Sequence, residues 1–382
     1  MSVREELEKL ELKILAPYAV KSCESRGREC AEEEHPYRTA FQRDRDRIIH
    51  TTAFRRLEYK TQVFVNFEGD YYRTRLTHTI ETSQIARTIA RAVGCNEDLT
   101  EAISLAHDLG HTPFGHSGEA ALNELMANQG GFNHNYQSIR IVEKLERRYA
   151  GFPGLNLTWE TREGIVKHTT DYDVAKAERF EPEKRASLEG QLVNAADEIA
   201  YMTHDLDDGL RSGLLVLAEL DSLRLWREAL EALGITRAAF AEMERRQVVR
   251  YLINHMVTDV IQTIHDGLQE LSIQSAQAVR DAPKNLVGFP PDSQVKNQEV
   301  RAFLLERLYR HHQVMRMQVK AQRLMRQLFE AYLQEPRQLP EEVRIRFGES
   351  SPERVVCDYI AGMTDRYAVQ EHRKLFDFAI LG

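Results

Sequence analysis

Two adjacent residues that could bind a metal ion, His107 and Asp108, stand at the end of an apolar helical stretch. An ionised aspartate is seldom buried unless it is paired or bound to a cation. The pair therefore indicates a metal site, although an aspartate that caps its own helix beside a surface histidine also explains an isolated pair. The apolar positions recur at the spacing of a buried helix face; they are Leu99, Ala102, Ile103 and Ala106.

Two further residues complete a set of ligands that divalent metals prefer. His78 shares a face of a predicted helix with Thr82 and Ile85, so its side chain should point inward. Asp197 lies beside another apolar helical stripe. Such metals bind imidazole and carboxylate together, and catalytic sites keep positions open for water. The sequence predicts one divalent ion (Mn, Mg, Fe, Ni or Zn) bound by His78, His107, Asp108 and Asp197.

The order of these ligands, with the residues around them, resembles the HD-domain phosphohydrolases. More narrowly, nearly the whole chain resembles the deoxynucleoside triphosphate triphosphohydrolases, the bacterial dGTPase-like proteins. Many phosphohydrolases share the ligand order, so longer runs carry the narrower resemblance. These runs are FQRDRDRIIH at 41–50, FRRL at 54–57, KTQVF at 60–64, HDLGHTPFGHSGE at 107–119, NAADEIAY at 194–201, LYRH at 308–311 and DYIAGMTD at 358–365.

The resemblance implies that a deoxynucleoside triphosphate is hydrolysed to deoxynucleoside and inorganic triphosphate. The metal would polarise the phosphoryl group and lower the pKa of bound water. His116 and Glu119 match the acid–base pair of the family. Near neutral pH an imidazole can protonate a departing alkoxide, and a carboxylate can hold the imidazolium. From the residues alone, Glu119 could instead be a capping-box glutamate.

Five residues are predicted to contact phosphate. Arg75 lies one helical turn before His78, where a guanidinium suits a phosphate oxygen and where a surface arginine is equally plausible. The resemblance implies that Tyr201 contacts phosphate and that Arg301 binds the terminal phosphates. It also makes His111 and His134 phosphate-contacting residues, although either could be an ordinary core histidine.

The resemblance assigns the sugar to three residues. Gln62 and Asp205 would hold the 3′-hydroxyl, and Tyr309 would pack beneath the sugar and exclude a 2′-hydroxyl. The residues alone also fit a solvated acidic face for Asp205 and a core position for Tyr309. Glu198 departs from the family pattern, because some relatives carry lysine there, and this puts a phosphate contact at that position in doubt.

Composition restricts the class of protein. The chain has 382 residues, of which 42% are hydrophobic and 29% charged, and its net charge is −8. No apolar run approaches the roughly 18 residues of a membrane span. The amino terminus alternates acidic and basic residues, unlike a signal peptide, and the four cysteines form no CxxC pair. We therefore expect a cytoplasmic protein with free thiols.

The periodicity predicts a nearly all-helical protein, and the resemblance implies an HD-domain helical core with a carboxy-terminal helical extension. We expect an N-terminal helical segment (1–59), an HD core (60–217) and a C-terminal region that completes the nucleotide site (218–382), with a small β-hairpin possible at 63–72. Besides the helices that carry His78 and His107, helices are predicted over about 4–15, 39–57, 120–127, 135–149, 188–217, 220–233, 238–275, 297–333 and 352–367, with a flexible loop at 281–294.

Two charged stretches have open interpretations. The alternating run at 43–47 could be a solvated ion-pair ladder, or it could touch phosphates or another subunit. Arg316, Lys320 and Arg323 form a basic stripe that could bind nucleic acid or a regulatory nucleotide, although a solvated face explains it more simply. The mild acidity of the chain argues against a general nucleic-acid coat.

The sequence is compatible with three functions. Triphosphohydrolysis is preferred, with deoxynucleoside triphosphates as substrate and effector, and with a homo-oligomer, based on a dimer or a hexamer, expected from the resemblance. The second hypothesis is another HD phosphohydrolase, acting on nucleoside monophosphates, cyclic nucleotides or guanosine polyphosphates. The third is a nucleotide sensor or a single-strand-binding regulator. Intact His116 and Glu119 argue against a purely binding role.

Overall fold

The computed structural model describes residues 2–62, 72–168 and 178–378. These residues form helices and two isolated β-bridges, Thr61–Thr74 and Arg147–Gly154, with no strand among them. The all-α prediction is confirmed. The predicted hairpin at 63–72 falls almost entirely outside the described residues. None of the helices in the described ranges has both the length and the apolar content to cross a membrane.

The described helices fall into two compact units. The first unit comprises Met1–Arg47, His78–Leu105 and Asn156–His311, and the second comprises Ile48–Thr77, Ala106–Leu155 and His312–Gly382. Each unit therefore combines three stretches of chain, and the division into contiguous segments at 59/60 and 217/218 stays a prediction. The helices are α1 (Val3–Ile14), α2 (Ala40–Ile49), α3 (Thr52–Arg56), α4 (Arg75–Ala92), α5 (Glu97–Ala106), α6 (His116–Leu125), α7 (His134–Arg140), α8 (Trp159–Val166), α9 (Leu188–Arg211), α10 (Leu217–Leu220), α11 (Arg224–Leu233), α12 (Glu242–Glu270), α13 (Ala276–Arg280), α14 (Pro291–Leu304), α15 (His312–Gln334), α16 (Glu341–Arg344), α17 (Pro352–Ala361) and α18 (Asp365–Phe376).

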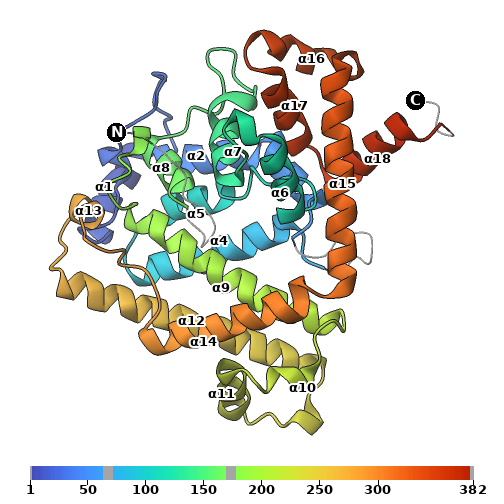
Figure 1. Cartoon of the computed structure of the whole chain (residues 1–382). Coiled ribbons are helices and arrows are strands. Elements are labelled where there is room, and N and C mark those ends of the chain that lie inside the picture. The colour runs from blue at the N-terminus through green and yellow to red at the C-terminus, as the bar shows by residue number, and fades with distance from the viewer. Residues whose placement is uncertain (1, 63–71, 169–177, 379–382) are drawn as a thin grey trace. The chain divides into compact units, whose positions relative to one another are not determined.

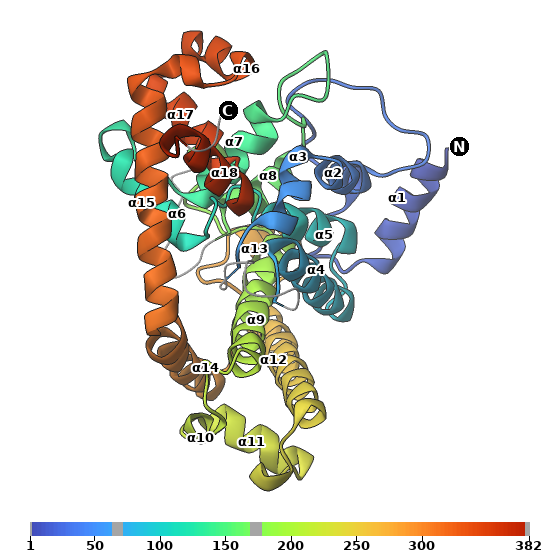
Figure 2. The same cartoon turned by 90° about the vertical axis from the view of Figure 1, so that its right-hand side faces the viewer.

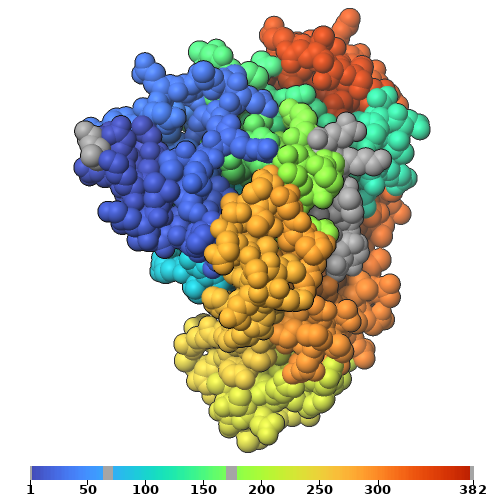
Figure 3. All heavy atoms as spheres, turned by 90° about the vertical axis from the view of Figure 1, so that its left-hand side faces the viewer, coloured from blue at the N-terminus to red at the C-terminus, as the bar shows by residue number. Residues whose placement is uncertain are grey.

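The first unit is organised around α9, which packs against α8, α12, α13 and α14 (Figure 1). Glycines let α8 approach both α9 and α5 closely. A Cβ atom added to Gly190 of α9 would lie 3.5 Å from Gly164 Cα of α8, and one added to Gly164 would lie 2.3 Å from Ile103 Cδ1 of α5. The segment before α9 lies along α13 on the surface (Figure 3), where Arg185 N donates to Arg280 O at 2.9 Å.

A buried carboxylate fixes the amino-terminal part of this unit. Asp44 Oδ1 lies 2.5 Å from Arg28 Nη1, and Asp44 Oδ2 accepts hydrogen bonds from Thr158 N at 2.8 Å and from Thr161 Oγ1 at 2.8 Å. Arg47 in turn pairs with Glu32 at 2.7 Å. The alternating run at 43–47 is therefore largely an internal ion-pair network, because Arg43, Asp44 and Arg47 are buried rather than solvated.

The second unit is organised around α15, which packs against α6, α17 and α18 (Figure 2). The exposed face of α15 carries the predicted basic stripe of Arg316, Lys320 and Arg323. The core of the unit is apolar, and its fully buried members include Leu122, Met126, Met325, Leu328, Tyr332, Val355, Val356 and Ile360.

A latch holds together three segments of the second unit. Asp365, the first residue of α18, is buried. Its carboxylate accepts hydrogen bonds from Thr61 N at 2.9 Å, from the Thr61 hydroxyl and from Phe114 N at 2.9 Å. Lys60 Nζ donates to Ala361 O at 3.1 Å and to His111 O. We call Lys60, Thr61 and Asp365 the latch; it holds the backbone of His111 and Phe114 in the loop that precedes α6.

Several helices end where the periodicity did not predict. The expected helix at 39–57 breaks at Thr51, whose hydroxyl accepts from Phe54 N at 3.0 Å and so caps α3. The expected helix at 352–367 divides after Gly362 into α17 and α18. Pro291 starts α14 within the expected loop at 281–294. The short helix α8 was not predicted.

Stability of the first unit should depend on pH through Glu189. Its buried Oε1 accepts from Val20 N at 3.0 Å and from Asn96 N at 3.1 Å, and burial raises the pKa of Glu189 from 4.5 to about 7. Between those values the unfolded chain has lost the proton and the folded chain has kept it, so stability falls as pH rises through this window. The full shift corresponds to about 3 kcal/mol. We expect Glu189→Gln to reduce the dependence of the free energy of unfolding on pH, which we call the slope. The measurement is urea unfolding at pH 5 and pH 7.5.

The exposed Glu24→Gln variant serves as the control and should keep the wild-type slope. An unchanged slope in Glu189→Gln would contradict the assignment.

The latch gives a second stability prediction. Asp365→Ala leaves the buried Thr61 and Phe114 donors without their acceptor, and each unsatisfied buried group costs about 1–3 kcal/mol. We expect the free energy of unfolding, measured by urea titration, to fall by at least about 3 kcal/mol. Glu353→Ala, which removes another acidic residue from a first helical turn of this unit, should cost less than about 0.5 kcal/mol. An equal loss of unfolding free energy in the two variants would show that the hydrogen bonds of Asp365 add no stability of their own.

Candidate functional site

Two of the predicted metal ligands meet in the first unit. His78, in the first turn of α4, is buried, and its Nε2 lies 2.9 Å from Asp197 Oδ1 of α9. His168 Nε2 lies 3.5 Å from the other oxygen, Asp197 Oδ2. Asp197 therefore has an imidazole against each carboxylate oxygen, and neutral imidazole with carboxylate is a donor set that divalent transition metals bind.

Another histidine, His204, contacts the ring nitrogen of His78 that does not face Asp197. His204 Nδ1 lies 3.3 Å from His78 Nδ1, and the two rings are nearly perpendicular at 87°. His204 Nε2 lies 2.9 Å from Glu81 Oε2 on α4. His204 is buried, whereas the Glu81 side chain is 44% exposed. The first unit thus contains a continuous chain of polar groups from Glu81 through His204 and His78 to Asp197.

The other two predicted ligands, His107 and Asp108, follow the end of α5 and are buried in the second unit. Asp108 Oδ2 lies 3.0 Å from Arg75 Nη1, and Asp108 Oδ1 lies 3.4 Å from His107 Nε2 and 3.3 Å from His111 Nε2. Burial alone would raise the pKa of Asp108, but its electrostatic interactions with His107 and Arg75 outweigh this effect and hold the pKa well below its usual range. The carboxylate is therefore ionised.

The turn after Asp108 requires glycine. A Cβ atom on Gly110 would lie 2.0 Å from His134 O, so only glycine permits this approach of the two segments. Gly115 precedes α6 with φ of 57° and lies against Arg75, whose Nη2 would be 3.3 Å from an added Cβ atom. The backbone thus brings Arg75 beside the loop that leads to His116.

The predicted acid–base pair is formed in the second unit. His116 is the first residue of α6, and its Nδ1 lies 3.2 Å from Glu119 Oε2. Glu119 Oε1 also accepts from His134 N at 2.8 Å and lies 2.9 Å from His134 Nδ1. Burial raises the pKa of Glu119, but hydrogen bonds from His116 and His134 outweigh it and lower the pKa well below its usual range. An ionised carboxylate therefore backs an imidazole whose side chain is 76% exposed.

His111 lies between these groups. It stacks on His134 with ring centroids 3.9 Å apart and makes an edge contact with His116 at 5.3 Å. Burial, and then the charge of Arg75, hold the pKa of His111 well below its usual range, so its ring is neutral at physiological pH. Ligand atoms of His111, His116 and Glu119 lie within 4.8 Å of one another, so this cluster could also hold a cation.

Two of the predicted sugar residues, Asp205 and Tyr309, bond to each other, and Arg301, which is predicted to contact phosphate, has an acidic partner. Tyr309 Oη donates to Asp205 Oδ2, and Arg301 pairs with Glu198, the residue that departs from the family pattern. Asp205 is buried, which excludes a solvated acidic face. Tyr201 lies between Asp197 and Asp205 on α9. In the second unit, Gln62 follows the latch residue Thr61 at the end of a described range.

Sequence reasoning missed four residues that contact the predicted site. His204 lies seven residues after Asp197, and this helical spacing places the two on one face of α9. Periodicity could therefore have found it. Nothing in the sequence marks His168 or Glu81 as partners of Asp197 and His204, and Lys60 is recognisable only inside the run KTQVF.

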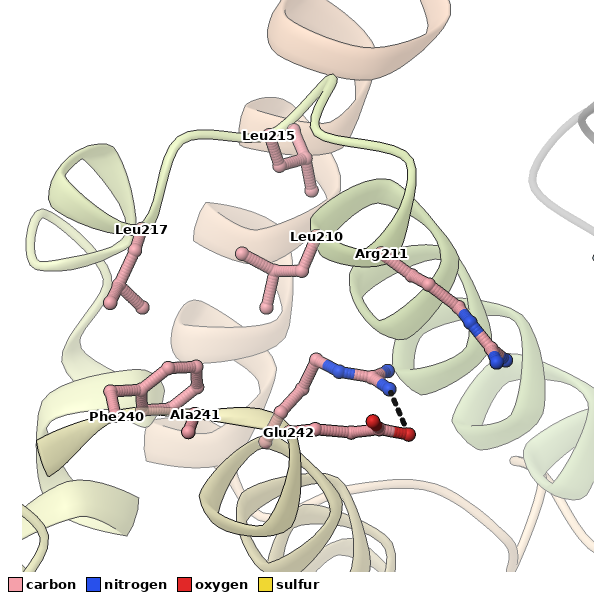
Figure 4. A pocket seen from close by; sticks show the side chains of 8 residues that line it. Leu210, Arg211, Leu215, Leu217, Phe240, Ala241 and Glu242 are labelled. Carbon is pink, nitrogen blue, oxygen red and sulfur yellow. Dashed lines mark ion pairs between the residues drawn. The ribbon is translucent and has the colours of Figure 1, made fainter.

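A cavity of about 390 Å³ lies at the carboxyl end of α9 in the first unit (Figure 4). Apolar side chains line it together with the charged residues Arg211, Glu242 and Arg245, and Arg245 lies 4.0 Å from Glu242. None of the residues that line this cavity is a predicted site residue. The cavity is therefore separate from the candidate chemistry.

Two family models match parts of this chain. An HD domain model matches residues 75–202, which contain all four predicted metal ligands, and a phosphohydrolase-associated domain model matches residues 287–374, which contain Arg301 and Tyr309. HD domains are metal-dependent, and His and Asp groups of this chain could bind a metal ion.

Three curated relatives cover almost the whole chain, and each is named deoxyguanosinetriphosphate triphosphohydrolase-like protein. The relative from Geobacter metallireducens is 54% identical over 95% of this chain and 95% of its own length. The relative from Geobacter sulfurreducens is 50% identical over 99% of both chains, and that from Ralstonia pickettii is 51% identical over 95% of this chain and 94% of its own. The chain therefore belongs to the deoxyguanosinetriphosphate triphosphohydrolase-like proteins and is an HD-domain hydrolase.

Proposed function

We propose that this protein hydrolyses deoxynucleoside triphosphates to deoxynucleoside and inorganic triphosphate in a metal-dependent reaction. The names of the relatives support this substrate class. The observation that carries the proposal is the His116–Glu119 pair, in which an ionised, largely covered carboxylate contacts an exposed imidazole. Such an imidazole can deliver a proton to a leaving oxygen.

We propose that the four sequence-predicted ligands, His78, His107, Asp108 and Asp197, bind one divalent ion. When bound, the ion would polarise a phosphoryl oxygen and lower the pKa of a coordinated water. Arg75 would hold Asp108 ionised and add positive charge next to a phosphate oxygen. The neutral ring of His111 and the ring of His134 would offer N–H groups to the phosphates.

His116 would protonate the departing 5′-oxygen of the sugar, and Glu119 would orient its ring and balance the imidazolium. Because Glu119 is also held by His134, its carboxylate position does not depend on His116 alone. Phosphoryl transfer depends chiefly on positioning and charge stabilisation, which the dense histidine, arginine and aspartate groups supply.

Selectivity for deoxyribose would come from Tyr309, whose hydroxyl is held by Asp205. A ring fixed in this way would leave no space for a 2′-hydroxyl, while Asp205, with Gln62, would bind the 3′-hydroxyl. Tyr201 and Arg301 would contact phosphates. The substrate would compete with Glu198 for Arg301. We further propose a cytoplasmic homo-oligomer in which deoxynucleotides also serve as effectors.

Product analysis tests the proposal directly. Manganese-loaded protein is incubated with each of the four deoxynucleoside triphosphates, singly and mixed, and phosphorus products are separated by chromatography. We expect tripolyphosphate and deoxynucleoside in equal amounts. Orthophosphate or pyrophosphate as the primary product would contradict the proposal and favour another HD phosphohydrolase. Turnover confined to mixtures would support an effector role for nucleotides.

Replacement of the proposed acid should separate catalysis from folding. His116→Ala should lower kcat by roughly 10²–10⁴-fold, which is the usual contribution of general acid catalysis. Metal content and thermal unfolding should stay unchanged because the side chain is largely exposed. His50→Ala, which removes an exposed histidine of the same unit, should retain full activity. Wild-type turnover in His116→Ala would eliminate this acid.

Two substitutions at Tyr309 separate its ring from its hydroxyl. Tyr309→Phe keeps the ring and should keep most of the preference for dGTP over GTP, whereas Tyr309→Ala should lower the ratio of the two kcat/KM values by at least about tenfold. The measurement is steady-state hydrolysis of both nucleotides. An unchanged ratio in Tyr309→Ala would show that the steric boundary lies elsewhere.

A further inference from the structure

A chain of hydrogen-bonding groups leads from solvent to the proposed metal ligand His78. Its outer end is Glu81, three residues after His78 and therefore on the same face of α4. The steps are Glu81 Oε2 to His204 Nε2 at 2.9 Å, His204 Nδ1 to His78 Nδ1 at 3.3 Å, and His78 Nε2 to Asp197 Oδ1 at 2.9 Å. All four residues belong to the first unit.

For neutral His78 and His204 rings beside an ionised Glu81, the hydrogen-bond roles along this chain follow from its geometry. An ionised carboxylate accepts hydrogen bonds only, so His204 Nε2 carries the proton that faces Glu81. In a neutral His204 ring, Nδ1 is then the acceptor, and His78 Nδ1 must be the donor that faces it. A neutral His78 consequently presents the electron pair of Nε2.

That electron pair points toward the carboxylate of Asp197. Two electron-pair donors 2.9 Å apart repel each other unless a proton or a metal ion lies between or beside them. The Thr82 hydroxyl, at 3.5 Å from Nε2, is at the limit of a hydrogen bond. The arrangement therefore suits a metal ion, and it depends on the acceptor that His204 offers to the far side of the His78 ring.

We propose that His204 and Glu81 are positioning residues that fix the tautomer and ring orientation of His78 for metal binding. This inference rests on the proposed function only in taking His78 and Asp197 as metal ligands. Neither His204 nor Glu81 is required to touch the metal or the substrate. Groups that orient a ligating histidine typically change metal affinity by 10–100-fold when they are removed.

Isothermal titration of chelator-treated protein with Mn²⁺ tests the proposal without any nucleotide. His204→Leu removes the acceptor and should weaken Mn²⁺ affinity by about 10–100-fold. His204→Asn places an amide oxygen near the position of Nδ1, where it can accept from His78, and should keep the affinity within about threefold of wild type. Glu81→Ala should weaken affinity by at least threefold, because it frees His204 to rotate or change tautomer.

Two control variants separate this role from a general structural one. Gln84→Ala removes an exposed residue of α4 that bonds only to Thr88 among the described residues, and His265→Leu replaces an exposed histidine on α12. Both should bind Mn²⁺ as the wild type does. Thermal unfolding of the metal-free variants verifies the fold, and if His204→Leu does not fold, Glu81→Ala and His204→Asn decide the outcome.

Wild-type affinity in His204→Leu or Glu81→Ala would overturn the proposal, and so would an equal loss in folded His204→Asn and His204→Leu. The result is independent of the substrate. Weakened Mn²⁺ binding together with no triphosphohydrolysis would refute the proposed function and keep the positioning role. Triphosphohydrolysis by the wild type together with unaffected Mn²⁺ binding in the variants would refute the positioning role and keep the proposed function.

Discussion

Burying a carboxylate costs several kcal/mol unless positive charge or hydrogen-bond donors surround it, and both units are built around this constraint. In the first unit, Asp44 is surrounded by Arg28 and the two threonines at the start of α8. In the second, Asp358 lies between Arg140 at 2.5 Å and Arg346 at 2.8 Å. These carboxylates connect distant parts of the chain and have partners whose charge does not change near neutral pH.

The carboxylates of the candidate site differ in the chemistry of their partners. Asp197 faces imidazoles on both oxygens, and Asp108 has two imidazoles and one guanidinium. An imidazole can give up its proton and present an electron pair, so these groups can exchange mutual hydrogen bonds for a metal ion. Glu119 also has two histidine partners. His134 is buried, whereas the His116 side chain faces solvent. The carboxylates of the candidate site thus differ from the structural ones in having imidazole partners, whose charge can change near neutral pH.

Periodicity predicted the all-helical class and the positions of the long helices, because their apolar stripes extend over several turns. It did not predict the breaks at Thr51 and Gly362, where a single side chain or glycine ends a pattern that otherwise continues. The residues of the pairs His78–Asp197 and His116–Glu119 could be selected from the sequence, because their types and spacing suggested chemistry. Helical spacing from Asp197 could have identified His204, which was overlooked. The importance of His168 and Asp365 depends on which distant segment lies opposite, and one sequence does not record tertiary partners.

The proposed chemistry requires His78, His107, Asp108 and Asp197 to bind one divalent ion together. This binding can be measured as metal content after equilibrium dialysis against Mn²⁺, by inductively coupled plasma mass spectrometry, in the wild type and in the Asp108→Ala and Asp197→Ala variants. We expect about one tightly bound ion per wild-type chain and its loss in each folded variant, whereas Asp266→Ala, at an exposed position, should retain it. A folded Asp108→Ala or Asp197→Ala protein with wild-type manganese content would show that these residues do not form one metal site.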